Sequence, residues 1–365
     1  MFKTNNYLGR VPALMTMMCA LAAATAFGAG ETLAQAKQGP SHDPLFLTAT
    51  NGANNFLAVV NTRTKETDYV PTGGFGGVSG NAGGVAVSGP IAAVVNFGST
   101  NVTIFVRQGN AMQPTQTIKT SSQPVSVAFG HDHLVVLELT AAESFPVYGN
   151  MVQATSDGVV QLARGDKSAG QIVTYDGGAV YTEKSGSVAE LGLSTNGMAG
   201  LSGPNNSILL PTAPNNDTPF GIVARGANVY LAIAHSDLEV LIANGQIVST
   251  ASGPTPFKNA LGGLTHAPCW NALSGHFLYA ADSPGMQLLR YLVSDNSIFF
   301  DKPGVAALNG SPTDLAVADG MLGVIDGGDG VTSNASLFDI DSEGELSLRF
   351  AVKIAGPING AAIID

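Results

Sequence analysis

The stretch Asn81–Phe105, NAGGVAVSGPIAAVVNFGSTNVTIF, gives the clearest indication of how this chain folds. It predicts three short strands at 84–87, 91–95 and 102–106, separated by a Gly-Pro turn and a Gly-Ser turn. Strands this close along the chain pair with one another in order, as an antiparallel meander. The stretch therefore predicts a small sheet made of consecutive strands.

The same pattern recurs along the whole chain. Seven copies, with spacings of 42, 45, 50, 42, 51 and 46 residues, fit a ring of blades better than a solenoid or a sandwich. We therefore expect an all-β fold, a seven-bladed β-propeller in which each blade is a four-stranded antiparallel meander. The residues that open the first strands are Gly84, Ser126, Gln171, Gly221, Gly263, Asp314 and Gly360.

The last copy indicates how the ring closes. Residues 360–363 form a first strand with no chain left to complete its blade. Residues 45–48, 56–61 and 67–70 form a second, third and fourth strand with no first strand before them. We expect the C-terminal strand to complete the N-terminal blade, which leaves no open edge in the ring.

The first 36 residues have the features of a signal peptide. Lys3 and Arg10 precede the apolar run 11–27, and Ala34-Gln35-Ala36 offers a small-x-small cleavage site. A transmembrane anchor is the alternative, but the run is short for a span. We expect a signal peptide at 1–36, one propeller domain at 37–365, and a protein secreted to the periplasm or the cell exterior.

Composition limits the partners of the mature chain. Without Lys3, Arg10 and Glu31, 14 basic and 26 acidic residues remain, a formal net charge of 14 − 26 = −12. Nucleic acid and anionic membranes are poor partners for that charge. Only Cys269 remains after cleavage, so no disulfide forms within the chain. We expect a monomer that recognises a small polar molecule or a protein.

Candidate site residues lie where each predicted second strand ends. Six of the seven positions are acidic or Asn, and the seventh, Ala234, is followed by His235, which could act as an acid, a base or a ligand. These ends would lie on one face and could ring a mouth of the central channel, where carboxylates could bind a divalent cation such as Ca²⁺ or Mg²⁺. The candidate ligand-binding residues are Asn51, Asn96, Glu138, Glu183, His235, Asp282 and Asp326.

A structural explanation competes with this one. Asn and Asp begin turns by bonding their own backbone two residues on, and a His can simply occupy a surface turn. Glu138 and Glu183 form turns less readily, so they are the first to test. The fragment His131-Asp132-His133 lacks a third ligand, and we expect no protein-bound metal centre and no resident cofactor.

The blades resemble the lactonase-like seven-bladed propeller family, which includes bacterial 6-phosphogluconolactonase, fungal carboxymuconate-cyclising enzymes and related YVTN-type repeats. The resemblance covers nearly all of the mature chain and implies fold more than activity. It is carried by AAVVNFGSTNVTIF, SGHFLYAADSPGMQLLRYLV, QPVSVAFGHDHLVVLEL, and SPTDLAVADGMLGVIDGG with FDIDSEGEL.

The family's catalytic pattern is met only in part. Where its enzymes open a blade with Pro-Arg-His, this chain has Pro124-Val125-Ser126, so the Arg and His that would handle a carboxylate substrate are absent. Glu138 survives from the family's Asn-Glu-Leu. We expect an exported propeller that binds a ligand or partner at one channel mouth. The alternatives are a lactonase-like hydrolase with Glu138 as base, and a purely structural repeat protein.

Overall fold

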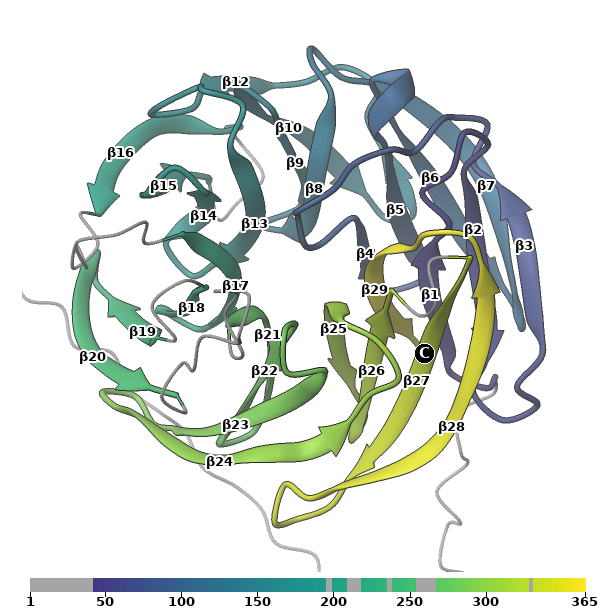
Figure 1. Ribbon diagram of the computed structural model, residues 1–365. Coiled ribbons are helices and arrows are strands. Elements are labelled where there is room, and N and C mark those ends of the chain that lie inside the picture. Colours follow the sequence, from purple (N-terminus) through teal and green to yellow (C-terminus); the bar gives the residue numbers. More distant parts are fainter. Residues whose placement is uncertain (1–41, 195–198, 209–217, 235–237, 254–266, 328–330) are drawn as a thin grey trace, which may run out of the picture. The chain divides into compact units, whose positions relative to one another are not determined.

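Seven antiparallel sheets make up the described part of the chain and follow one another around a ring (Figure 1). The computed structural model describes residues 42–194, 199–208, 218–234, 238–253, 267–327 and 331–365. Besides strands and loops, these residues form one short 3-10 turn, η1 (Phe97–Ser99), and no helix long and apolar enough to cross a membrane. The predicted all-β, seven-bladed propeller is confirmed.

The first three blades follow the prediction from sequence, with one elaboration. Blade three carries its fourth strand as two short pieces that both pair with its third strand. The strands are β29 (Asn359–Ile364), β1 (Leu45–Ala49), β2 (Phe56–Asn61) and β3 (Thr67–Pro71) in blade one; β4 (Val85–Ser88), β5 (Ile91–Asn96), β6 (Asn101–Gln108) and β7 (Ala111–Lys119) in blade two; β8 (Pro124–Gly130), β9 (His133–Glu138), β10 (Ala141–Tyr148), β11 (Met151–Val152) and β12 (Gly158–Gln161) in blade three.

Blades four to seven are four-stranded meanders in strict chain order. Their strands are β13 (Ala169–Tyr175), β14 (Gly178–Glu183), β15 (Ser187–Gly192) and β16 (Ser202–Ile208); β17 (Pro219–Arg225), β18 (Asn228–Ile233), β19 (Leu238–Ala243) and β20 (Gln246–Ser252); β21 (Pro268–Ser274), β22 (Phe277–Asp282), β23 (Gln287–Val293) and β24 (Ile298–Ala307); and β25 (Pro312–Ala318), β26 (Met321–Asp326), β27 (Thr332–Ile340) and β28 (Leu346–Ala355).

The two ends of the described chain share blade one. β29 is the inner strand of that blade and pairs antiparallel with β1, from Leu45 opposite Ile364 to Ala49 opposite Asn359. Its next neighbours around the ring are β4 on one side and β25 on the other. The predicted closure by the C-terminal strand is therefore confirmed, and it leaves no open edge between blades one and seven.

Blade six corrects one detail of the predicted repeat. The stretch beginning at Gly263 was expected to be its first strand, but residues 263–266 lie outside the described residues and the inner strand is β21. Its register pairs Pro268 with Asp282, as Pro124 pairs with Glu138 in blade three. Trp270 therefore occupies the position assigned to Gly263. The prediction was wrong because glycine opens the first strand at Gly84, Gly221 and Gly360, whereas a tryptophan takes that position in blade six.

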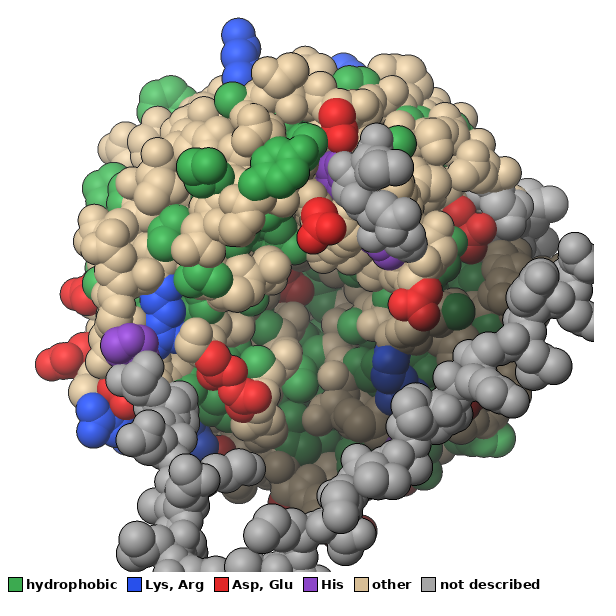
Figure 2. Space-filling model, turned by 180° about the vertical axis from the view of Figure 1, so that it is seen from behind, with side chains coloured by type: hydrophobic (Ala, Val, Ile, Leu, Met, Phe, Trp, Pro, Cys, Tyr) green, Lys and Arg blue, Asp and Glu red, His purple; other side chains and the backbone are tan. Residues whose placement is uncertain are grey.

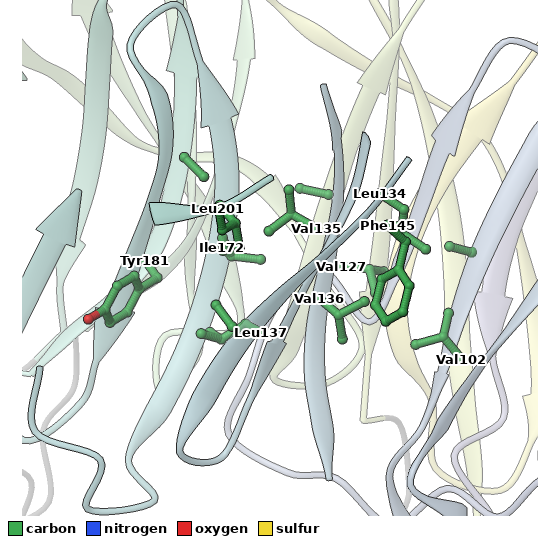
Figure 3. Packing of buried hydrophobic residues seen from close by; sticks show 14 of the residues in the cluster. Val102, Val127, Leu134, Val135, Val136, Leu137, Phe145, Ile172, Tyr181 and Leu201 are labelled. Atoms are coloured by element: carbon green, nitrogen blue, oxygen red, sulfur yellow. The ribbon is translucent and has the colours of Figure 1, made fainter. Parts of the chain in front are cut away.

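The inner strands run from a front face, where the connections between blades reach them, to a rear face, where tight turns lead into the second strands. The second strand of each sheet is buried on both sides because a neighbouring blade covers each of its faces, whereas the outer strands are largely exposed. Figure 3 shows the two junctions of blade three, where Val102 of blade two, Phe145 of blade three and Tyr181 of blade four are at most 1% exposed. Burying a side chain of this size stabilises the fold by about 1.5–3 kcal/mol.

Candidate functional site

The polar residues predicted at the second-strand ends lie at the front corners of their blades. Asn51 follows β1 and is half-buried, and His235 lies outside the described residues. The other five side chains are fully buried. Asn96 ends β5, Glu138 ends β9, Glu183 ends β14, Asp282 ends β22 and Asp326 ends β26, each with 0% exposure.

Glu138 accepts hydrogen bonds from the connection between blades two and three. One of its carboxylate oxygens accepts hydrogen bonds from the backbone N–H of Ser122, at 2.6 Å, and from the hydroxyls of Ser121 and Ser122, at 2.7 and 2.9 Å. The two serines belong to the connection that leads into β8. Burial raises the pKa of Glu138 to about 7 despite these bonds, and Glu143 adds to the rise. Glu138 thus anchors a connection between blades.

Glu183 and Asp282 repeat this arrangement in blades four and six. Glu183 accepts hydrogen bonds from the backbone N–H groups of Arg164, at 3.0 Å, and Gly165, at 2.8 Å. Asp282 accepts one from the N–H of Ala267 at 2.9 Å. Each donor lies in the connection just before an inner strand, where backbone N–H groups have no partner in the sheet. The carboxylate supplies that partner.

Asn96 and Asp326 are held by side chains as well. Asn96 Oδ1 accepts a hydrogen bond from the Thr72 hydroxyl at 2.7 Å, and its Nδ2 donates to Thr103 Oγ1 at 2.8 Å. Asp326 Oδ1 accepts one from Asn334 Nδ2 at 2.6 Å. Among the described residues, no three His, Cys, Asp or Glu side chains are grouped so that they could hold a metal ion. The five buried residues therefore lie apart, each at its own blade.

His131 and His133 lie at the rear of blade three. His131 and Asp132 form the turn between β8 and β9, with positive φ angles of 52° and 57°. The buried His133 ring contacts Asp157 Oδ2 through Nε2, at 2.9 Å, and the backbone oxygen of His131 through Nδ1, at 2.7 Å. Both ring nitrogens of His133 are thus occupied by protein partners.

The connection from blade one to blade two runs across the centre of the ring (Figure 1). Residues 78–83, called here the crossing segment, contact four other blades by hydrogen bonds. Their backbone and the Asn81 side chain supply the donors and acceptors. The bonds join Asn81 Nδ2 to the Val125 oxygen, Ala82 N to the Gly170 oxygen at 3.3 Å, Gly83 N to Asp314 Oδ2 at 2.9 Å, and Trp270 Nε1 to the Asn81 oxygen at 3.1 Å.

Asn51 and Gly83 fix the course of the backbone through the crossing segment. Asn51 fixes the start of the crossing segment, because its Oδ1 accepts hydrogen bonds from the N–H groups of Gly77 and Val78, at 2.7 and 3.1 Å. Gly83 has a φ of +67°, and a Cβ there would lie 2.8 Å from Ser126 Oγ. Only glycine adopts that conformation readily and leaves room for the serine.

A pocket of about 280 Å³ opens on the front face, between the crossing segment and blades one, six and seven. We call it the front pocket. Of the predicted site residues that the structure describes, Asn51 alone lines it. The described lining residues include no ionisable side chain, and the polar ones are Asn51, Ser79, Asn81, Thr313, Ser333 and Asn359.

Asn81, Asn359 and Trp270 give the front pocket its fixed geometry. The Asn81 and Asn359 amides bond reciprocally, at 2.8 and 3.2 Å, so each satisfies a donor and an acceptor of the other. The Trp270 ring packs edge-on against Phe220 at a centroid distance of 5.1 Å. Lys184 lies beside this pair, 5.7 Å from the Phe220 ring centroid, and donates to the Gly80 oxygen; burial lowers its pKa.

Sequence reasoning missed most of these residues. Asn81, Asn359 and Lys184 carried no signal, because neither repeat position nor spacing marks a side chain that reaches another blade. Trp270 did carry one. It is the only tryptophan of the chain, and a lone large aromatic ring in a glycine-rich protein deserves a place among the candidates.

No family model and no curated protein sequence matches the chain. Solved structures do match in three dimensions. A protein from Lactobacillus plantarum superposes with a TM-score of 0.66 at 14% identity, over 88% of this chain and 99% of that one. A proposed 6-phosphogluconolactonase from Bacteroides fragilis gives 0.65 at 13%, over 90% and 99%. The periplasmic gluconolactonase of Pseudomonas aeruginosa gives 0.64 at 14%, over 88% and 99%.

These likenesses concern the fold. At 13–14% identity they confirm the expected resemblance to lactonase-like seven-bladed propellers in three dimensions. They assign no residue of this chain a role, because one propeller architecture supports many unrelated functions.

Proposed function

We propose that this protein is an exported propeller that binds a small, neutral, polar molecule in the front pocket, of the size and chemistry of a sugar or a sugar lactone. The observation that carries the proposal is the lining of that pocket. Amide and hydroxyl groups can donate to and accept from a polyhydroxylated ligand, and the Trp270 indole offers an apolar surface. Because these groups are neutral, they favour a neutral ligand.

The size of the front pocket favours a small molecule over a protein. Its volume of about 280 Å³ is at the low end of ligand sites. A protein partner would need a contact area far larger than this concavity. The amide pair of Asn81 and Asn359 also fixes the lining before any ligand arrives, which reduces the entropy lost on binding.

Trp270 provides a direct test. Because it is the only tryptophan, selective excitation reports on the front pocket alone. We expect a saturable change in its fluorescence when sugars and sugar lactones are titrated. Ser79→Phe, at an exposed residue of the lining, should abolish the change, whereas Ser347→Phe, on the exposed face of β28, should not. If none of the sugars and sugar lactones gives a saturable change in Trp270 fluorescence, the proposal is refuted.

A lactonase-like hydrolase is the second candidate. Two observations support it: the fold likeness to a gluconolactonase and the pKa of Glu138 near 7, which suits a general base at neutral pH. We expect that any lactone turnover would be lost in Glu138→Gln. Melting of the variant must be measured beside turnover, because Glu138 also anchors the connection to β8. Turnover that persists in a folded Glu138→Gln protein would exclude Glu138 as the base.

Export rests on residues 1–36 and accords with the periplasmic location of one structural neighbour. Cleavage after Ala36 would release a chain that begins at Lys37. N-terminal sequencing of the protein recovered from the periplasm or the medium tests this directly. A cell-associated protein that retains residues 1–36 would contradict it.

A further inference from the structure

The rear half of the central channel is a cavity of its own. It has a volume of about 270 Å³ and is lined by the inner strands from blades two, three, four, five, seven and one. We call it the rear channel. Figure 2, seen from behind, shows the molecule hollowed at its centre, with hydrophobic side chains inside the hollow. The rear channel therefore opens on the face opposite the front pocket.

The wall and the floor of the rear channel differ in chemistry. Most side chains of the wall are aliphatic or aromatic, such as Val127, Phe129 and Val173, and Thr174 lies among them. The floor is the end of the crossing segment at Gly83. Asp314 fixes it, because its Oδ2 accepts hydrogen bonds from Gly83 N at 2.9 Å and from Ala361 N at 3.2 Å.

One side-chain donor in the rear channel lacks a partner among the described residues. Asp314 already accepts three backbone N–H bonds, and the Thr174 hydroxyl donates to the Phe129 oxygen at 2.8 Å. Gln171 uses its Oε1 to accept from Ile222 N at 2.7 Å, but its Nε2 donates to none of the described residues. That Nε2 lies 3.6 Å from where a Cβ of Gly83 would be, so it stands at the floor.

We propose that the rear channel binds one small, largely apolar molecule that carries a carbonyl oxygen, such as a cyclic ketone. The apolar body fills the space between the valines, the alanines and Phe129, which removes apolar surface from water on both sides. The carbonyl oxygen accepts a hydrogen bond from Gln171 Nε2. This ligand differs in class from that of the front pocket, and the crossing segment separates the two.

The test uses the ketone α-tetralone and its parent hydrocarbon tetralin, titrated calorimetrically into the intact protein. We expect one α-tetralone per chain, bound roughly threefold to tenfold more tightly than tetralin, which is the effect of one hydrogen bond. Equal affinities for the two compounds, or no binding of either, would overturn the proposal.

Two variants locate the site. Ala224→Leu fills the rear channel and should weaken α-tetralone binding by at least about tenfold, whereas Ala351→Leu, on the exposed face of β28, should leave it unchanged. Gln171→Glu keeps the acceptor for Ile222 but removes the donor, so it should abolish the preference for α-tetralone over tetralin. If Ser79→Phe blocks binding and Ala224→Leu does not, the ketone occupies the front pocket and the proposal is wrong.

Discussion

The front pocket and the rear channel are two ends of one passage, yet different parts of the blades line them. The front is lined by the starts of inner strands and by connections, whose backbone groups need partners; the Asn81 amide supplies one to the Val125 oxygen. The rear is lined by inner strands, each the edge strand of its sheet, and most of their side chains there are aliphatic. The crossing segment keeps the two environments apart.

The largest effect is expected from removal of β29, the strand that lines both the front pocket and the rear channel. Deleting residues 359–365 takes Asn359 from the front pocket and Ala361 from the rear channel, and leaves β1 as an unpaired edge. We expect no cooperative thermal unfolding in circular dichroism and a largely aggregated product. Removal of Asp365 alone is the matched control and should melt like the full chain. Near-native melting of the long deletion would contradict the closure.

A double-mutant cycle on the Asn81–Asn359 amide pair tests the lining of the front pocket alone. Asn81→Ala leaves Asn359 and the Val125 oxygen without a partner, and we expect it to cost about 1–3 kcal/mol in the free energy of unfolding. Asn359→Ala should cost a similar amount. Because both variants lose the same contact, the double variant should cost less than the sum of the two. Strict additivity in urea unfolding would show that the two amides do not interact.

The floor of the rear channel should respond to pH. Burial raises the pKa of Asp314 from 3.8 to about 7, so the folded protein retains a proton that the unfolded chain has released. The free energy of unfolding should therefore fall as the pH rises from 3.8 to about 7. Urea unfolding at several pH values should show a shallower fall in Asp314→Asn. An unchanged pH dependence in that variant would exclude Asp314 as its source.

Divalent cations should have the smallest effect. The buried carboxylates at the front corners accept hydrogen bonds from backbone N–H groups, as Glu138 and Glu183 do. We therefore expect millimolar Ca²⁺ or Mg²⁺ to leave the melting temperature almost unchanged. A rise that is absent from the Glu138→Gln, Glu183→Gln double variant would instead support the cation site that the sequence allows.

Some features of the fold could be predicted from the sequence and others could not. The repeats and the closing strand could be predicted because hydrophobic alternation and turn residues are local signals, as in the stretch 81–105. The second-strand ends were located correctly at Glu138 and Asp282. What these side chains do could not be read from the sequence, because their partners lie in connections whose paths depend on the assembled ring.

The crossing segment illustrates the same limit. Its glycines predicted a connection toward the channel, but not that Asn81 would bond to blades one and three or that Gly83 would meet Asp314. Such contacts join residues up to 278 positions apart. No period or motif encodes them, so the front pocket could not be derived from the repeat pattern.

The pairing of β29 with β1 also has a kinetic consequence. Leu45 and Ile364 are direct neighbours in the sheet although 364 − 45 = 319 positions separate them along the chain. Bringing the ends of so long a loop together costs about 3 kcal/mol more in chain entropy than closing a ten-residue loop. Pairing that is this distant in sequence forms slowly. Six blades can form from local contacts, but the seventh must wait until the ring has brought its two halves together.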